Sequence, residues 1–297
     1  MDQAAKLREL IKNQNNTKSM ARVITVTSGK GGVGKSSVSV NLAMWLRRMG
    51  KRVVILDADF GLANVEVMLG IRPQYNLADL MFKGKSLNDI ITEGPEGIGF
   101  ISGGSGIAEL INLTSEQVVS LAQKLSELDQ FADVIIVDTG AGISDNVMEF
   151  VAVSQEVLLV ATPEPTSITD AYALLKTLNK KNSDSGSMTV KLVANKVEND
   201  IDGRKLCDKL NIVVKKFLDI NLEYLGSVIM DISVTKAVMQ QKPFSMVYPN
   251  SAASRSVQAI ANKLCGQEAN VNVGNSRGIT KMFSGLIARI NQKNQNR

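Results

Sequence analysis

The chain has 297 residues, of which 44% are hydrophobic and 21% charged, so it is long enough to bury the core of one large or two small globular domains. No apolar run is long enough for a membrane-spanning helix, and we expect no secretory signal because the first residues lack an apolar stretch. The formal net charge is +5, and much of the excess lies at the two ends, which argues against nucleic acid as a partner.

Histidine is absent, and the only two cysteines, Cys207 and Cys265, lie far apart in the sequence. The absence of histidine excludes Ser-His-Asp triads and histidine-containing zinc sites. An iron–sulfur cluster usually needs four thiolates, so it would require the cysteines of a second subunit. We expect both cysteines to be reduced structural residues of a cytoplasmic protein.

Three regions differ in composition, and we expect them to be three structural units. Residues 1–20 are polar and predict a flexible tail that carries a short helix. Residues 21–265 contain the β-branched runs of a folded domain. Residues 266–297 begin with a Gly- and Asn-rich linker and end in an amphipathic segment.

Short β-branched runs alternate with helix-period segments throughout the central region. The expected strands are residues 23–27, 53–56, 134–137, 157–161 and 190–194, with weaker candidates at 98–102 and 225–230. Helical periodicity is clear at residues 36–49, 118–128 and 168–178. This alternation predicts an α/β fold, a doubly wound and mostly parallel sheet with helices on both faces.

The segment over residues 29–36 fits the phosphate-loop pattern G-x-x-x-x-G-K-[ST]. It follows an expected strand and opens an expected helix, where backbone N–H groups and a helix N-terminus can hold phosphate. Lys35 is expected to reach the β- and γ-phosphates, and the Ser36 hydroxyl is expected to ligate Mg²⁺. The predicted phosphate-binding residues are Gly29, Lys30, Gly31, Gly32, Val33, Gly34, Lys35, Ser36 and Ser37.

A second lysine inside the loop adds a more specific signal. The pattern K-G-G-x-G-K-S at residues 30–36 resembles the deviant Walker A motif of the MinD/ParA group of SIMIBI-class P-loop ATPases. The resemblance implies an ATP-bound homodimer in which Lys30 crosses the interface and touches the nucleotide of the other subunit, where its charge stabilises phosphoryl transfer. The alternative is that Lys30 is only solvated.

Acids at two strand ends extend the resemblance. Asp59 resembles the acid of the family's second motif, which orients the attacking water and supports Mg²⁺, whereas Asp57 would fix local structure. Asp138 ends an apolar strand like a Walker B acid and should hold Mg²⁺ through water. Gly140 falls in the segment that resembles the second switch and would place a backbone N–H near the γ-phosphate. The predicted catalytic residues are therefore Lys30, Lys35, Asp59 and Asp138.

Three further positions are assigned by the same resemblance. Asp170 would pair with Lys30 when ATP is absent, with stabilisation of a helix N-terminus as the alternative. Asn195 would read adenine, and Pro249 would line the other side of the base. The run Asn-Lys-Val-Glu at residues 195–198 is also one methylene away from the N-K-x-D guanine motif. The longer acid would be misplaced against guanine, so we expect ATP, with GTP as the alternative.

Six apolar residues near the carboxyl end recur with helical spacing and fill an arc of roughly 140°. They are Ile279, Met282, Phe283, Leu286, Ile287 and Ile290. Basic residues lie beside this face, which predicts a helix that binds an anionic membrane surface. The alternative is a helix docked on the protein's own core.

The amino-terminal tail carries a second family signature. Its residues Asp2, Gln3, Ala4, Leu7 and Arg8 resemble the D-Q-A-x-x-L-R activator motif of the FlhG (YlxH/FleN) family, MinD-like ATPases that set flagellar number and position. The resemblance implies that the tail stimulates FlhF, an SRP-type GTPase, and that flagellar C-ring proteins are further partners. The alternative is a disordered tail without a partner.

These observations favour a slow ATP hydrolase that acts as a switch in the cytoplasm and lies on the inner face of the membrane when ATP is bound. A MinD-type division-site selector is an alternative, which the activator-like tail argues against. A ParA-type DNA-partition ATPase is another, which the amphipathic end argues against. The missing cysteine pair argues against an iron–sulfur carrier.

Overall fold

The computed structural model describes residues 20–59, 64–104, 115–182 and 188–266, together with residues 278, 279, 282, 284 and 285. The predicted activator residues Asp2, Gln3, Ala4, Leu7 and Arg8 lie outside the described residues, as do Phe283, Leu286, Ile287 and Ile290 of the predicted membrane face. The division into tail, nucleotide-hydrolase domain and carboxyl-terminal segment stays a prediction.

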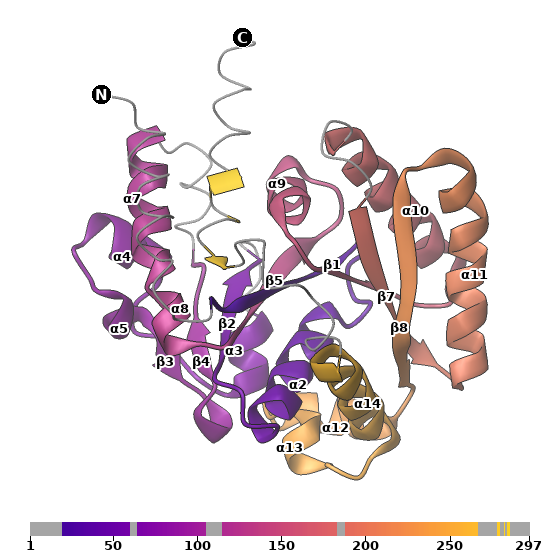
Figure 1. Cartoon of the computed structure of the whole chain (residues 1–297). Coiled ribbons are helices and arrows are strands. Elements are labelled where there is room, and N and C mark those ends of the chain that lie inside the picture. The colour runs from indigo at the N-terminus through magenta and orange to yellow at the C-terminus, as the bar shows by residue number, and fades with distance from the viewer. Residues whose placement is uncertain are drawn as a thin grey trace.

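An eight-stranded sheet forms the centre of the described part of the chain (Figure 1). Its strand order is β3-β4-β2-β5-β1-β6-β7-β8, and all neighbours are parallel except β3, which runs antiparallel to β4. The strands are β1 (Arg22–Ser28), β2 (Val53–Ala58), β3 (Thr92–Glu93), β4 (Gly99–Ile101), β5 (Val134–Ala141), β6 (Val157–Ala161), β7 (Met188–Val197) and β8 (Ile220–Ile229). Because the chain winds to one side of β1 first and to the other side from β6 onward, the carboxyl end of β1 is the point where such sheets bind ligands.

Helices cover both faces of the sheet, which confirms the predicted doubly wound α/β fold. One face packs against α2 (Lys35–Arg48), α3 (Asn64–Leu69), α12 (Ile232–Met239), α13 (Phe244–Val247) and α14 (Ala252–Gly266). The opposite face packs against two groups of helices. Over β2 and β4 lie α4 (Leu77–Phe82), α5 (Leu87–Ile90), α7 (Ser115–Ser126) and α8 (Leu128–Phe131), and over β6 to β8 lie α9 (Asp145–Val153), α10 (Pro165–Lys181) and α11 (Asp200–Phe217).

The predicted strands are confirmed, although several are longer than their apolar runs, most of all β5, β7 and β8. The last strand begins at Ile220 rather than at residue 225, because its first half alternates buried and exposed residues along the edge of the sheet. The seventh strand extends to Val197 and includes a register irregularity after Asn195. Helix α10 begins at Pro165, three residues before the predicted start, because proline is well suited to the first turn of a helix.

The described residues of the carboxyl-terminal segment contact the body of the protein. The side chains of Ile279 and Met282 are 0% and 2% exposed and belong to the apolar cluster formed with α7, α8 and α9. A Cβ at Gly285 would lie 3.2 Å from side-chain atoms of Val153 at the end of α9. The expectation that Ile279 and Met282 face a membrane is therefore wrong for these two residues, because both side chains are part of the protein core. Among the described residues, no helix is long and apolar enough to cross a membrane.

Asp129 in α8 is a partly buried carboxyl group beside this segment. Its Oδ1 accepts the backbone N–H of Ala21 at 3.0 Å, and its Oδ2 has no hydrogen-bond partner among the described residues. Burial raises the pKa of Asp129 from 3.8 to about 6. Since the folded protein holds this proton more tightly than the unfolded chain, ionised Asp129 destabilises the fold above pH 6, and the penalty disappears as the pH falls from 6 toward 4.

We expect Asp129→Asn to stabilise the protein at pH 7.5, because the amide keeps the acceptor for Ala21 and carries no charge to desolvate. The gain should be on the order of 1–2 kcal/mol, or about 2–6 °C in melting temperature, and should shrink toward zero at pH 4.5. Thermal unfolding of both proteins between pH 4.5 and pH 7.5 measures it. Asp133→Asn is the matched control and should give no such gain, because hydrogen bonds from Arg52 lower the pKa of Asp133. A gain that is equal at all pH values would contradict the titration of Asp129.

Candidate nucleotide site

The predicted phosphate loop connects β1 to α2 at the carboxyl edge of the sheet. Gly34 has a left-handed backbone with φ of +90° and is the residue from which α2 begins at Lys35. A Cβ at this position would also lie 2.3 Å from Nδ2 of Asn195, so both the conformation and the space require glycine. The amino end of α2, with its unpaired N–H groups, therefore opens directly at the loop.

Gly29 is glycine for a different reason. A Cβ here would lie 2.2 Å from the backbone oxygen of Asp170, so the start of the loop packs directly against the backbone of α10. Ser28 supports the same turn by donating its hydroxyl to the carbonyl of Lys30 at 3.0 Å. The loop is thus held between α2 and α10 by contacts within the protein.

Lys35 and Asp138 form a buried ion pair at the centre of the site. The Lys35 ammonium donates to Asp138 Oδ2 at 3.1 Å, and the two side chains are 7% and 0% exposed. The Ser39 hydroxyl donates to Asp138 Oδ1 at 2.6 Å, and Lys35 also lies 3.4 Å from the Ser36 hydroxyl oxygen. The structure thus brings together three predicted residues, Lys35, Ser36 and Asp138, and adds Ser39, which the motif did not single out.

Asp57 and Asp59 follow one another at the end of β2, next to this pair. Asp57 is buried, is aligned with Asp138 in the neighbouring strand, and accepts the backbone N–H of Asp59 at 3.0 Å. Burial, together with the negative charge of Asp138, raises the pKa of Asp57 to about 8. The Asp59 carboxylate lies over Gly140, where a Cβ would be 3.6 Å from Asp59 Oδ1. The two predicted acids of the motif therefore occupy different environments, with Asp59 nearer the surface.

The segment after β5 is tied to the phosphate loop by the backbone. Gly142, with φ of +93°, donates its N–H to the carbonyl of Ser28 at 2.8 Å, and the Thr139 hydroxyl donates to the carbonyl of Val26 at 3.1 Å. Gly140 lies between these anchors, under Asp59. The predicted second switch therefore lies beside the end of β1, and its contact with the γ-phosphate stays a prediction.

Lys30 lies at the exposed edge of the loop. Its ammonium donates to Glu164 Oε2 at 3.0 Å and to the Thr166 hydroxyl at 2.7 Å. Asp170, the partner expected from the sequence, does not make this contact in the structure. The residues nearest Lys30 are Glu164, which caps α10, and Thr166 in its first turn, whereas Asp170 presents its backbone to Gly29. The family resemblance did not single out Glu164 or Thr166, and only the first turn of α10 brings them to the loop.

The end of β7 braces the other side of the loop. Asn195 is buried and donates Nδ2 to the carbonyl of Val33 at 2.6 Å, and Lys196 donates its ammonium to the carbonyl of Gly32 at 2.8 Å. In this conformation the amide of Asn195 is therefore used within the protein, and its contact with adenine stays a prediction. Pro249 lies in the exposed turn after α13. Sequence reasoning noticed Lys196 only as part of a guanine-like motif.

The residues present fit a Mg²⁺-nucleotide. The Ser36 hydroxyl and the carboxylates of Asp138 and Asp59 are hard oxygen ligands, and Lys35 lies among them as the cation that a phosphate would attract. No group of three or more acidic or thiol side chains in the described ranges could hold a metal ion alone. A bound Mg²⁺ would therefore share its ligands between these oxygens and the phosphates of the nucleotide, and it would neutralise their charge.

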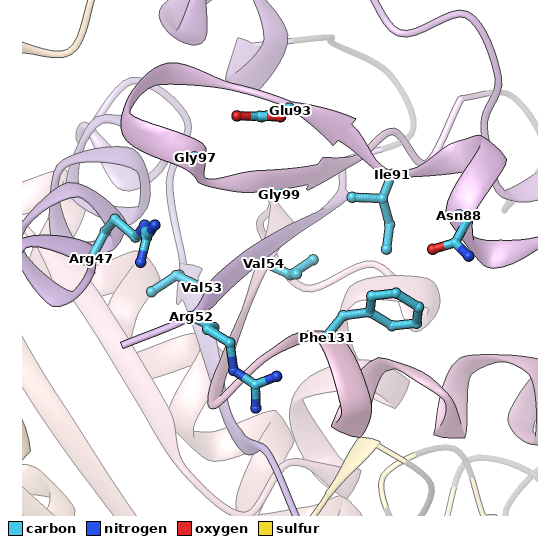
Figure 2. Close-up of a pocket in the computed structure, with 10 residues that line it drawn as sticks. All are labelled: Arg47, Arg52, Val53, Val54, Asn88, Ile91, Glu93, Gly97, Gly99 and Phe131. Atoms are coloured by element: carbon cyan, nitrogen blue, oxygen red, sulfur yellow. The ribbon is translucent and has the colours of Figure 1, made fainter. Parts of the chain in front are cut away.

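A cavity of about 440 Å³ lies elsewhere, at the amino ends of the strands. Figure 2 shows Val53 and Val54 of β2 between the guanidinium groups of Arg47 and Arg52 and the apolar side chains of Ile91 and Phe131. Because Val53 opens β2 whereas Asp57 and Asp59 follow its end, this cavity lies at the opposite edge from the phosphate loop. It is not part of the nucleotide site.

The family model and the curated relatives that match this chain agree with one another. A model of the ParA family, described as NUBPL iron-transfer P-loop NTPase, matches residues 19–265. The antiactivator FleN of Pseudomonas aeruginosa is 46% identical over 243 residues, which cover 82% of this chain and 86% of that protein. The flagellum site-determining protein YlxH of Helicobacter pylori is 35% identical over 89% of this chain and 90% of that protein.

Solved structures agree in fold. The MinC:MinD cell division protein complex of Aquifex aeolicus matches with a TM-score of 0.67 at 22% identity, covering 87% of this chain and 100% of that one. MinD of Pyrococcus horikoshii, complexed with Mg-ADP, matches with a TM-score of 0.66 at 22% identity, covering 85% and 100%. With the site geometry and the two close relatives, these findings show that the chain belongs to the FlhG (YlxH/FleN) branch of the MinD/ParA family of P-loop ATPases.

Proposed function

We propose that this protein is an ATP-hydrolysing switch that dimerises with ATP, thereby controls its own attachment to the membrane, and regulates the number and placement of flagella. The observation that carries this proposal is the position of two lysines in one phosphate loop. Lys35 is buried against Asp138, whereas Lys30 lies at the edge, with its side chain 35% exposed, and pairs with Glu164, which is 58% exposed. Such an exposed pair contributes little free energy, so Lys30 can exchange Glu164 for a phosphate of a second subunit.

The surface around Lys30 supports association with a second copy. Four exposed apolar side chains, Ile143, Ile201, Met230 and Ile232, follow the ends of β5, β7 and β8. Because the carboxyl ends of parallel strands meet at one edge of a sheet, these side chains share the edge of the phosphate loop. Exposed apolar residues along the edge that carries a functional site favour a protein interface, and a second subunit at this edge would bury them.

The chemistry available predicts slow hydrolysis. The chain has no histidine, and Asp59 is placed beside Gly140 to position a water rather than to act as a strong base. Lys35 would hold the β- and γ-phosphates, and Lys30 of the second subunit would stabilise the charge of the transferred phosphoryl group. The rate would therefore depend on dimerisation, as a switch requires.

ATP is favoured over GTP by the chemistry of the base-reading segment. Glu198 is longer than the aspartate of a guanine-reading motif, and it lies exposed beyond the end of β7. Asn195 and Pro249 are the proposed adenine contacts. Displacement of a fluorescent nucleotide by ATP and by GTP discriminates the two.

The docked carboxyl-terminal segment would link dimerisation to the membrane. Since Ile279 and Met282 are buried in the body, these two side chains can bind lipid only after they leave this position. One short helix binds a membrane weakly, whereas two in a dimer bind through avidity. Attachment to an anionic membrane would therefore follow the ATP-bound dimer.

The flagellar role rests on the relatives. They are named an antiactivator, FleN, and a flagellum site-determining protein, YlxH, and both cover most of this chain. We propose FlhF and flagellar C-ring proteins as partners, with the tail as the part that activates FlhF. Septum-site selection is the second candidate, because MinD of Bacillus subtilis is 28% identical over 91% of this chain.

Substitutions at Asp59 and Lys30 test the switch. Asp59→Ala should lower ATP hydrolysis by about 100-fold while the ATP dimer persists, because the water loses its positioning group. Lys30→Ala should bind ATP as a monomer. Glu164→Gln is the matched control and should retain both dimerisation and hydrolysis, since in the proposed dimer Lys30 contacts a phosphate of the second subunit instead of Glu164. Light scattering with ATP and phosphate release measure these outcomes, and hydrolysis by Asp59→Ala at the wild-type rate would exclude the assigned role.

Liposome sedimentation tests the membrane step. With vesicles that contain anionic lipid, the full chain should sediment with ATP and remain in solution with ADP. Ile287→Glu should abolish sedimentation while leaving Ile279 and Met282 in place, as should deletion of residues 277–297. Val153→Glu should raise sedimentation with ADP, because it puts a charge where the docked segment contacts α9. Equal sedimentation of the full chain and the deletion variant under both nucleotides would refute membrane control.

The tail is tested on purified FlhF. A peptide of residues 1–20 should stimulate GTP hydrolysis by FlhF, and Gln3→Ala should remove most of this stimulation. Lys6→Ala is the matched control, because residue 6 is a variable position of the activator pattern. If the wild-type peptide gives no stimulation, FlhF is not the target of the tail.

A further inference from the structure

Lys196 stands at an irregular point of the sheet. Asn195 is aligned with Val228 and Val197 with Ile229, so Lys196 is the extra residue of a bulge between β7 and β8. Its backbone is left-handed, with φ of +56°, which is uncommon for a residue with a long side chain. Bulges of this kind turn a side chain out of its regular alternation, and strained residues of this kind collect at functional sites.

The bulge aims two successive side chains at two successive carbonyls. Asn195 Nδ2 donates to the carbonyl of Val33 at 2.6 Å, and Lys196 Nζ donates to the carbonyl of Gly32 at 2.8 Å. In a regular strand, neighbouring side chains point to opposite faces, so this paired contact depends on the bulge. The structure gives Lys196 no other hydrogen bond or ion pair among the described residues.

The geometry of the peptide group gives this contact a consequence. In a trans peptide, the carbonyl oxygen and the following N–H point in opposite directions. When Lys196 and Asn195 hold the carbonyls of Gly32 and Val33 on the side of β7, the N–H groups of Val33 and Gly34 point away from β7. N–H groups that point away from β7 are available to a phosphate held by the loop, where backbone N–H groups bind phosphate oxygens.

We propose that Lys196 is a positioning residue that orients the Val33 and Gly34 N–H groups toward the β-phosphate of the bound nucleotide. It acts through the Gly32 carbonyl and does not itself touch the nucleotide. This inference rests on the proposed ATP binding at the same loop. Its charge also polarises the peptide between Gly32 and Val33, which makes the Val33 N–H a better donor to an anion.

A positioning residue should change the affinity for nucleotide, whereas a merely structural residue should change the stability of the protein, so both quantities are measured in Lys196 variants. Lys196→Met keeps the length of the side chain without its donor, and Lys196→Gly keeps the left-handed backbone at no steric cost. Both should bind Mg-ADP and Mg-ATP about tenfold more weakly than the wild type, as loss of one charge-assisted hydrogen bond predicts. Lys196→Arg, which can still donate to Gly32, should restore most of the affinity.

AMP provides the internal comparison, because it lacks the β-phosphate. Its affinity, measured by competition against fluorescent ADP, should be the same in all four proteins, and their melting temperatures without nucleotide should differ little. Lys209→Ala removes an exposed lysine of α11 and should change none of these values.

Three results would contradict the role of Lys196 or the ATPase function on which it rests. Unchanged ADP affinity in both Lys196→Met and Lys196→Gly would overturn the proposal, as would an equal loss for AMP and ADP, which would place Lys196 at the nucleoside. A wild-type protein that binds neither ADP nor ATP would instead refute the proposed ATPase function. If one variant fails to fold, the other still decides.

Discussion

Buried charge at the phosphate loop is the constraint on which the site depends. The Lys35 ammonium and the Asp138 carboxylate are withdrawn from water, and an unpaired buried charge costs several kcal/mol, so each requires the other. Ser39 holds the second oxygen of Asp138, and the raised pKa of Asp57 lets this third group take up a proton instead of adding an uncompensated charge. An entering phosphate therefore meets a cation that is already held in place and needs only to exchange its partner.

Three lysines around one loop differ in function because they differ in surroundings. Lys35 is buried and directed inward, Lys30 is at the edge and held by a weak pair, and Lys196 is behind the loop and holds a carbonyl. The same ammonium group thus binds the ligand of its own subunit, remains available to a second subunit, or shapes the backbone. Their order in the sequence does not reveal this division, whereas their contacts do.

Much of the fold could be predicted from the sequence, because buried parallel strands appear as short β-branched runs and the phosphate loop has its own pattern. The rest depended on tertiary placement. Glu164 replaced Asp170 as the contact of Lys30 because α10 starts three residues earlier than its apolar period indicates. The bulge at Lys196 leaves no trace in an alternating pattern. Ile279 and Met282 carry the same apolar spacing whether they face lipid or the protein core, and only packing distinguishes the two.

The glycines of the loop have different surroundings, so each is required for a different reason. Gly31 has open space where a side chain would stand, Gly34 has a left-handed backbone beside Asn195, and Gly29 touches the backbone of α10. Gly29, the first glycine of the phosphate-loop motif, is therefore required by the close packing of α10 rather than by contact with a phosphate. In a relative with alanine at this position, the seventeen-residue helix α10 would have to stand farther from the loop, and the partners that it offers Lys30 would move with it.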